Sequence, residues 1–231
     1  MKRVFDVVVS GLAILLLSPL LIPVMILLRL TGEGEVFYRQ ERVGFGRKPF
    51  SIYKFATMLK DSPKLPGGDI TVGSDPRILP VGRVLRNTKV NELPQLLNVF
   101  LGDMSLIGWR PLTPRVASLF PEAHWDALAH WRPGLSGIGS LVFRDEEQLL
   151  TGVADRQTVY ASVIVPYKSA LEVWYTKHQS FWLDLKLIAI TAGAVIGFKP
   201  DLYRIFSDLP PPPATLMQLR DVASRPQFQK A

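Results

Sequence analysis

The sequence predicts a mainly α-helical protein with a few short β-strands, of the α+β class, attached to a membrane through its N-terminal helix. Three observations indicate this fold. No charged residue occurs over the 22 positions from Val7 to Leu28, leucines follow helical spacing near residue 95, and two aromatic and β-branched segments flank a glycine turn. We expect residues 1–31 to form the membrane segment, residues 32–200 a compact domain, and residues 201–231 a Pro-rich, loosely ordered tail.

The composition of the 231 residues excludes several classes of protein. A hydrophobic share of 48% with 20% charged residues supplies a core and excludes wholesale disorder. The absence of cysteine excludes a disulfide framework, a thiolate metal site and cysteine catalysis, and three histidines argue against a His-rich zinc site. The net charge of +7 favours a polyanionic partner, namely a nucleic acid, an anionic membrane or a phosphorylated substrate. Because no helix-turn-helix, zinc-finger or RNP signature is present, we expect no nucleic acid partner.

The uncharged N-terminal run has the length of a membrane helix, since about 20 apolar residues cross the hydrocarbon core of a bilayer. A cleaved signal peptide is excluded because its apolar region is shorter and ends in an A-x-A-like site. A helix buried in a protein core is the other alternative. Ser18-Pro19 lies at the centre of the run and Pro23 follows, so we expect a kink. The hydroxyl of Ser18 can satisfy a backbone carbonyl that the proline leaves free.

Basic residues flank this run on both sides and bear on its topology. They are Lys2 and Arg3 before it, and Arg29, Arg39, Arg42, Arg47 and Lys48 after it. The positive-inside tendency draws both ends to the cytoplasm. A kinked, re-entrant helix that enters and leaves by the same face satisfies both ends, whereas a tilted spanning helix with a proline kink is the alternative. Either topology leaves the compact domain in the cytoplasm.

The remaining elements follow from composition and spacing. Residues 36–56 predict two short strands around a turn at residues 44–46, and residues 61–76 resemble a loop. Residues 79–102 have helical spacing that ends at Gly102, with an apolar face formed by Leu93, Leu96, Leu97 and Phe100.

The C-terminal half predicts further helices. Residues 121–131 and 155–178 have amphipathic patterns separated by a loop at residues 132–134. The 12 uncharged residues from Leu187 to Phe198 are too few to span a bilayer, so we expect a buried or interfacial helix there.

The stretch from Arg83 to Pro111 combines basic and acidic residues in a pattern that suits phosphate chemistry. They are Arg83, Arg86, Lys89 and Arg110, with Glu92 and Asp103. A helix is expected to begin near Asn91, and a helix start can receive a phosphate. Arginines bind phosphate oxygens, and a carboxylate beside a phosphate commonly holds Mg²⁺.

A plainer interpretation of the same residues stays open. Asn91 and Glu92 also suit a helix cap and a first-turn acid, the arginines suit a solvated helix face, and Asp103 suits a turn. From the residues alone, the chain is a candidate for a membrane-attached, phosphate-binding protein.

Several motifs occur in an order that identifies a family. They are Ser18-Pro19, Gln40-Glu41-Arg42-Val43-Gly44, Lys54-Phe55-Ala56-Thr57-Met58, Asp75-Pro76-Arg77, Leu85-Arg86, Glu92-Leu93-Pro94-Gln95, Gly102-Asp103-Met104-Ser105-Leu106, Arg110-Pro111, and Arg132-Pro133-Gly134-Leu135-Ser136-Gly137. Over roughly residues 2–200 the chain resembles the bacterial sugar transferases, the monotopic polyprenyl-phosphate phosphoglycosyl transferases.

The resemblance implies an activity and a location. It implies transfer of a phospho-sugar from a UDP-sugar to polyprenyl phosphate, with Mg²⁺ on the diphosphate, at the bacterial inner (cytoplasmic) membrane. This step begins the assembly of a polysaccharide or glycoconjugate. The partners implied are the UDP-sugar, the polyprenyl phosphate and membrane lipids, and a homo-oligomer stays open.

The resemblance also implies roles for individual residues. The catalytic positions are Asn91 and Glu92, and Glu92 also holds the metal. Ser18 and Pro19 form the membrane kink. The implied substrate-binding residues are Lys54, Arg86, Asp103, Arg110, Pro111 and Arg132. In the family an Asp-Glu pair stands at the helix start, where the aspartate attacks the sugar-linked phosphate and the glutamate assists.

This sequence departs from the family at the nucleophile position, where Asn91 replaces the aspartate. A carboxamide is a far weaker nucleophile than a carboxylate, so a covalent intermediate on Asn91 is not expected. Three interpretations are open: Glu92 acts as nucleophile or as base for direct attack by the lipid phosphate, the protein is an impaired paralogue that binds substrate or acts as a scaffold, or the asparagine was introduced to block the reaction. Lesser departures are Ala56, Trp109 and the loop after Gly137, which bears on the sugar or nucleotide bound.

Overall fold

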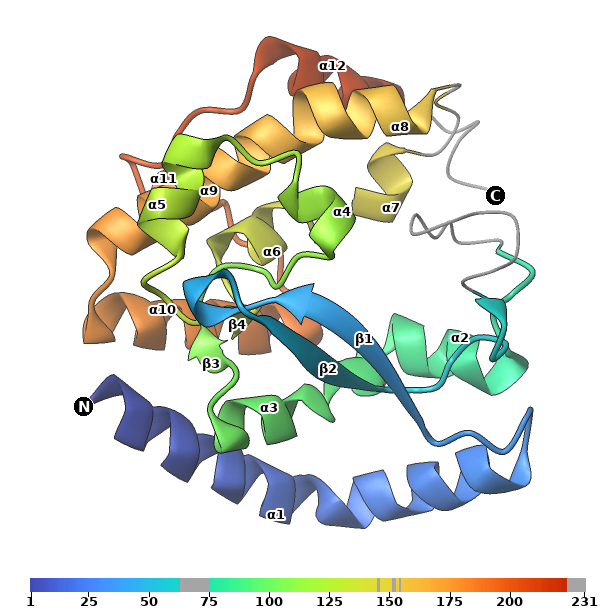
Figure 1. The fold of residues 1–231 in the computed structure, drawn as a ribbon. Helices are drawn as coiled ribbons and strands as arrows, with labels where there is room; N and C mark the ends of the chain where they lie inside the picture. Colours follow the sequence, from blue (N-terminus) through green and yellow to red (C-terminus); the bar gives the residue numbers. More distant parts are fainter. Residues whose placement is uncertain (63–74, 145, 151–152, 154, 224–231) are drawn as a thin grey trace.

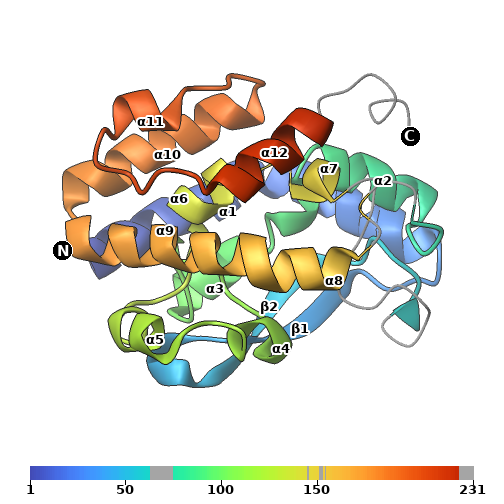
Figure 2. The same ribbon diagram turned by 90° about the horizontal axis from the view of Figure 1, so that it is seen from above.

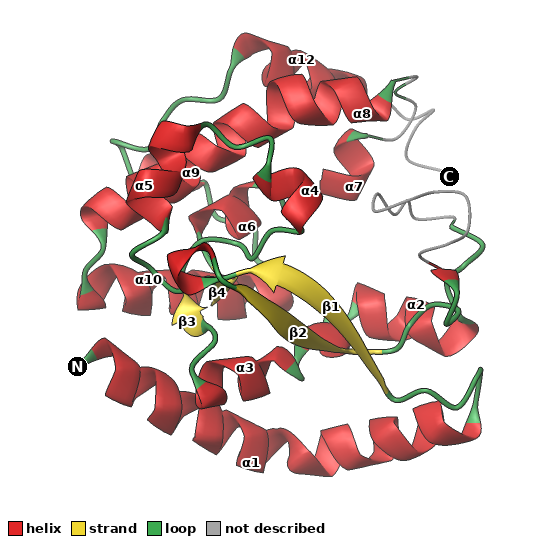
Figure 3. Cartoon of the chain, viewed as in Figure 1, coloured by secondary structure: helices red, strands yellow, loops and turns green. Residues whose placement is uncertain are grey.

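The computed structural model describes residues 1–62, 75–144, 146–150, 153 and 155–223, so most of the expected loop at 61–76 lies outside the described residues. Helices predominate and the strands are short, which confirms the predicted α+β class (Figure 3). The first half contains α1 (Lys2–Leu30), β1 (Phe37–Val43), η1 (Phe45–Arg47), β2 (Pro49–Phe55), α2 (Pro80–Asn87), η3 (Val90–Glu92), α3 (Gln95–Leu101) and β3 (Ser105–Ile107). The second contains α4 (Pro114–Ala117), α5 (Glu122–Leu128), β4 (Gly134–Ser136), α6 (Ile138–Val142), α7 (Glu146–Leu149), α8 (Arg156–Val159), η4 (Tyr160–Ile164), α9 (Val165–His178), α10 (Phe181–Val195), α11 (Leu202–Ile205) and α12 (Ala214–Ala223).

Helix α1 is continuous through Pro19 and Pro23, and its two halves run in different directions (Figure 1). Proline has no backbone N–H, so Pro19 leaves the carbonyl of Leu15 without its helical donor. The hydroxyl of Ser18 donates to that carbonyl over 2.7 Å, as the sequence predicted. The helix is long and apolar enough to cross a membrane, and only 11% of its most apolar window is buried. This low burial argues against a core helix.

Both ends of α1 contact the rest of the chain. Near the N-terminus, Lys2 Nζ donates to the carbonyl of Ile107 over 3.1 Å and pairs with Asp184 at 2.5 Å. The buried carboxylate of Asp6 accepts from Ser105 Oγ and from the backbone N–H of Leu106. At the other end, Leu28 is buried in a cluster with Phe55 and Leu85. The helix is therefore fastened along one side of the protein rather than projecting from it (Figure 1).

The β1–β2 hairpin lies between α3 and α4 (Figure 1). Its antiparallel register pairs Phe37 with Phe55 and Val43 with Pro49. Asn98 of α3 fastens β2, because its amide accepts from the N–H of Tyr53 and donates to the carbonyl of Ser51. The predicted stop at Gly102 is confirmed by its left-handed φ of 106°. The second pair of strands, β3 and β4, is parallel.

The predicted helix start near Asn91 is wrong by several residues. Asn91 and Glu92 belong to the single turn η3, and α3 begins at Gln95 after Pro94. Lys89 has a left-handed backbone conformation, with φ of 60°, which turns the chain before η3. Glu92 therefore stands in a turn ahead of α3 rather than in its first turn.

The largest core lies between α9, α10 and the C-terminal segment. We expected a loosely ordered tail over residues 201–231, but the described part of it, residues 201–223, packs into this core. Four residues of that segment are buried in this core: Leu202, Phe206, Leu209 and Leu216. The carbonyl of Pro210 accepts a hydrogen bond from Tyr167 Oη, which fixes the polyproline run. Helix α12 packs against α7 and η4 (Figure 2). Apolar residues on both sides of the prolines supply the burial that the run itself lacks.

Helix α10 contains most of the run from Leu187 to Phe198, where a buried or interfacial helix was expected, and it ends at Val195. Leu187 and Ala194 are buried in it, whereas Val195 is 59% exposed.

Candidate functional site

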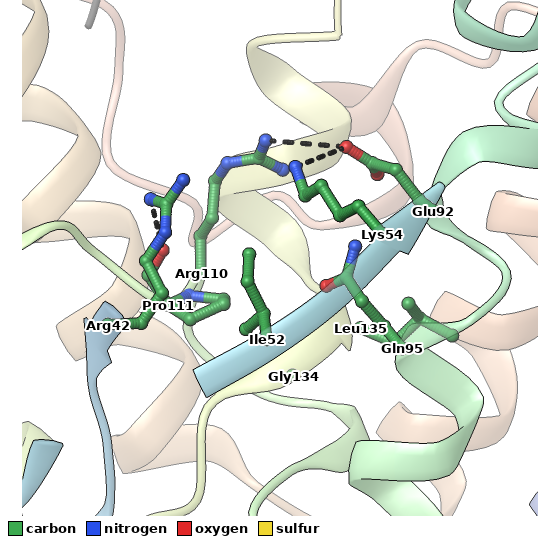
Figure 4. A pocket seen from close by; sticks show the side chains of 9 residues that line it. All are labelled: Arg42, Ile52, Lys54, Glu92, Gln95, Arg110, Pro111, Gly134 and Leu135. Atoms are coloured by element: carbon green, nitrogen blue, oxygen red, sulfur yellow. Dashed lines mark hydrogen bonds and ion pairs between the residues drawn. The ribbon is translucent and has the colours of Figure 1, made fainter. Parts of the chain in front are cut away.

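A small pocket forms where the β1–β2 hairpin, η3, α3, the segment after β3 and β4 meet (Figure 4). Its lining combines three cations and one carboxylate with an amide and apolar groups. The lining residues are Arg42, Ile52, Lys54, Glu92, Gln95, Arg110, Pro111, Gly134 and Leu135. The fold thus brings residues that lie as far apart as positions 42 and 135 into one pocket. Four of the lining residues were predicted as site residues: Lys54, Glu92, Arg110 and Pro111.

Glu92 is the centre of the charged groups in this pocket. Lys54 Nζ lies 3.2 Å from Glu92 Oε1, and Arg110 Nη2 lies 4.0 Å from the same oxygen. The two cations reach Glu92 from strand β2 and from the segment after β3, as Figure 4 shows. The side chains of Lys54 and Glu92 are 18% and 26% exposed, so water screens this contact only in part.

The neighbouring charges and burial shift the pKa values of Glu92 and Lys54. The charge of Lys54 lowers the pKa of Glu92 to about 2 against the opposing effect of burial, and Arg110 adds to the lowering. Burial lowers the pKa of Lys54 to about 8, with Glu92 opposing and Arg110 adding to the lowering. Glu92 is therefore ionised at neutral pH. With three cations against one carboxylate, the pocket keeps a positive charge that suits a phosphate or diphosphate.

The carboxylate of Glu92 has one oxygen available to a metal ion. Both cations contact Oε1, and Oε2 has no hydrogen-bond or ion-pair partner among the described residues. No group of three or more Asp, Glu or His side chains within the described ranges could hold a metal alone. A metal here needs oxygens from a substrate, which suits Mg²⁺ because it takes one or two protein carboxylates with phosphate oxygens and water.

Asn91 lies next to Glu92 in η3 but does not line the pocket. Its side chain is buried, and its Oδ1 atom has no hydrogen-bond partner in the described part of the chain. Asn91 therefore does not act as a cap, because it lies inside η3, whose N-cap is Lys89.

The three other predicted binding residues lie outside the pocket lining. Arg86 on α2 approaches the sulfur of Met58 at 3.9 Å. Asp103 accepts from Asn98 Nδ2 over 3.1 Å at the end of α3. Arg132 donates to the carbonyl of Gly102 over 2.8 Å and lies over the ring of Phe45. The structure does not bring these residues together with Glu92.

Arg42 and Gln95 line the pocket although we did not predict them as site residues. Arg42 Nη1 donates to the carbonyl of Pro111 over 3.0 Å, and Nη2 donates to Gln40. Both residues belong to motifs that identified the family, at positions 40–44 and 92–95. Their place in those motifs was a usable signal.

The chain belongs to the bacterial sugar transferase family, whose model matches residues 1–198. It is 34% identical over 202 residues to the "Undecaprenyl-phosphate glucose phosphotransferase" of Komagataeibacter xylinus, covering 82% of this chain and 35% of that protein. It is 35% identical over 195 residues to the "Exopolysaccharide production protein PSS" of Rhizobium leguminosarum bv. phaseoli, covering 81% of this chain and 91% of that protein. It is 34% identical over 200 residues to the "UDP-N-acetylgalactosamine-undecaprenyl-phosphate N-acetylgalactosaminephosphotransferase" of Aeromonas hydrophila, covering 85% and 44%. The chain thus spans nearly all of one relative and less than half of the other two.

Proposed function

We propose that this protein is a membrane-associated phosphoglycosyl transferase that moves a sugar-1-phosphate from a UDP-sugar to a polyprenyl phosphate, at the start of polysaccharide or glycoconjugate assembly. The observation that carries the proposal is the convergence of Lys54, Arg110 and Arg42 around the ionised Glu92. The names of two relatives state an undecaprenyl-phosphate phosphotransferase activity for those proteins, which supports the same class here.

In this proposal the cations of the pocket bind the diphosphate of the donor. Guanidinium groups bind phosphate oxygens with two N–H groups, and Lys54 adds a point charge. Glu92 would hold Mg²⁺, and the ion would supply charge neutralisation on the transferring phosphoryl group. Gln95 is left to donate to a phosphate or sugar oxygen through its amide.

Asn91 determines the form of the reaction that we propose. Glu92 is a weak base because Lys54 and Arg110 hold its pKa low. The lipid phosphate needs no base, since a phosphate monoester already carries between one and two charges at pH 7. We therefore assign direct transfer. An oxygen of the lipid phosphate forms a bond to the sugar-linked phosphorus of the donor, the bond to the UMP oxygen breaks, and UMP leaves.

This mechanism requires both substrates at once, and a labelled-UMP exchange experiment tests it. Without lipid, the protein should not exchange labelled UMP into UDP-sugar, because no covalent intermediate forms on Asn91. Asn91→Asp should create that exchange. Exchange by the unmodified protein would contradict direct transfer and favour Glu92 as the nucleophile.

The second candidate is a paralogue that binds the donor without turnover, and the replacement of the nucleophile by Asn91 favours it. Incubation of the protein in lipid nanodiscs with Mg²⁺, polyprenyl phosphate and a panel of UDP-sugars distinguishes the two. The first proposal predicts UMP release matched by sugar-linked lipid. Donor binding without either product favours the second candidate, and the absence of binding removes both.

We also propose that α1 is re-entrant, with the compact domain on the cytoplasmic face of the inner membrane. The contacts of Lys2 with Asp184 and of Leu28 with Phe55 support this topology, because both ends of the helix reach the same domain. The sequence has no cysteine, so a single cysteine inserted after Met1, or placed at the exposed Glu33, can be labelled without background from the chain. In spheroplasts, a membrane-impermeant thiol reagent should label neither position until the membrane is opened. Labelling of one position in intact spheroplasts would favour a spanning helix.

A further inference from the structure

The buried carboxylate of Glu172 has no role in the chemistry described above. It lies on α9 with 2% of the residue exposed, and its Oε1 atom accepts from the backbone N–H of Arg110 over 3.1 Å. Its Oε2 atom is buried and has no hydrogen-bond partner among the residues that the structure describes. Because an incompletely paired buried carboxylate is costly, the contact with Arg110 calls for a functional reason.

The residues around Glu172 leave room for its carboxylate to accept the hydrogen bond from the Arg110 backbone. Gly139 on α6 lies so close that an added Cβ would collide with Glu172 Oε1. One turn before Glu172 on the same helix, Lys168 is also buried and pairs with Glu146 Oε2 at 2.6 Å. Burial raises the pKa of Glu172 to about 7, and the hydrogen bond from the Arg110 N–H and the charge of Lys168 oppose this rise.

The main chain at Arg110 is held from two sides. Glu172 accepts from its N–H, and Arg42 donates to the carbonyl of the next residue, Pro111. Just before it, Trp109 is completely buried, and its indole N–H donates to the carbonyl of Trp131. The side chain of Arg110, by contrast, is 40% exposed, and its one ion pair with a described residue is the long contact to Glu92, to which Glu146 and Glu172 add a weaker attraction. Its position in the pocket therefore depends on where its backbone is held.

We propose that Glu172 is a positioning residue for the donor pocket, which places the Arg110 guanidinium opposite Glu92 by holding the Arg110 backbone. Gly139 is the residue that leaves room for this contact. The effect on substrate rests on the proposed function, whereas the effect on Arg110 itself does not. Either protonation state of Glu172 keeps an oxygen acceptor, so Glu172→Gln should preserve the position and Glu172→Ala should lose it.

The first test needs no substrate and measures the rate at which phenylglyoxal modifies Arg110, followed by mass spectrometry. Glu172→Ala should raise this rate severalfold because the side chain is released from Glu92, and Gly139→Ala should do the same by displacing the carboxylate. Glu172→Gln should match the parent protein. The control is Asp6→Ala, which removes another buried carboxylate that accepts a backbone N–H four residues earlier in the same segment. An unchanged rate in Glu172→Ala, or an equal rise in Asp6→Ala, would overturn the proposal.

The second test measures UDP affinity by calorimetry in the parent and in Arg110→Ala. Glu172→Ala should weaken binding about tenfold in the parent and have little effect in Arg110→Ala, since the lost contact acts through that side chain. Equal weakening in both backgrounds would show a general structural role and contradict the proposal. If the parent itself binds no UDP, the proposed function fails, and the phenylglyoxal rates alone decide the role of Glu172.

Discussion

Lys54 Nζ lies 3.2 Å from Glu92 Oε1, across the pocket from one strand of the hairpin to the turn before α3. Because of this contact, each group shifts the pKa of the other. The charge of Lys54 holds the pKa of Glu92 at about 2, and Glu92 limits the fall in the pKa of Lys54, which burial brings to about 8. Near neutral pH both groups are charged, and a further rise in pH changes the charge of Lys54 but not that of Glu92.

Donor binding should therefore weaken above about pH 8. Lys54 loses its positive charge as the pH passes its pKa, whereas Glu92 stays ionised throughout this range. The dissociation constant of a UDP-sugar should rise by up to about tenfold per pH unit above that point. Lys54→Arg should remove this dependence because a guanidinium stays charged. Calorimetric titrations between pH 6 and pH 9 check both statements, and equal pH profiles for the two proteins would contradict them.

Arg42→Ala should weaken donor binding by about 1.5–3 kcal/mol, which is the usual contribution of hydrogen bonds to a charged group. The reason is that Arg42 lines the pocket beside Pro111. Arg39 on the same strand supplies the matched control, because it is exposed and lies over the ring of Tyr53 instead. UDP-sugar affinities of the two alanine variants provide the comparison. A loss in Arg39→Ala as large as that in Arg42→Ala would indicate that total charge, and not the pocket, binds the donor.

The hydroxyl of Ser18 should stabilise α1 only because Pro19 is present. Ser18→Ala leaves the carbonyl of Leu15 without a donor and should cost about 1 kcal/mol. In a Pro19→Ala background the backbone N–H returns to that carbonyl, so the same substitution should cost close to nothing. Thermal unfolding of the four proteins in detergent measures this coupling. Equal costs in both backgrounds would mean that the serine has another role.

The segment after residue 200 should contribute strongly to stability. Leu216 is completely buried, so Leu216→Ala should cost about 2–5 kcal/mol through loss of packing and creation of a cavity. Its neighbour Met217 is 43% exposed, and Met217→Ala should cost far less. Denaturant unfolding of the two variants makes the comparison. Similar midpoints would contradict the packing of α12 against the core.

The sequence was most informative where a pattern depends on local chemistry. The uncharged run predicted α1, the proline and serine at its centre predicted the satisfied carbonyl of Leu15, and glycine predicted the end of α3. The ordered motifs predicted Lys54, Glu92 and Arg110, which meet in one pocket.

Contacts between distant segments could not be read from local patterns. Glu172 has no motif around it, and its contact with the Arg110 backbone can be seen only once α9 is packed against the segment after β3. The burial of Leu216 depends on the surface that α7 and η4 offer, so the prolines before it suggested a loose tail. The helix start was misplaced because a left-handed Lys89 could not be foreseen from its residue type.

A structure with a bound UDP-sugar and Mg²⁺ tests the central claim most directly. We expect the diphosphate between Arg42, Lys54 and Arg110, with the metal on Glu92 Oε2 and on oxygens of the diphosphate. A diphosphate bound instead beside Arg83 and Arg86 on α2, with Glu92 free of metal, would contradict the assignment of this pocket as the donor site.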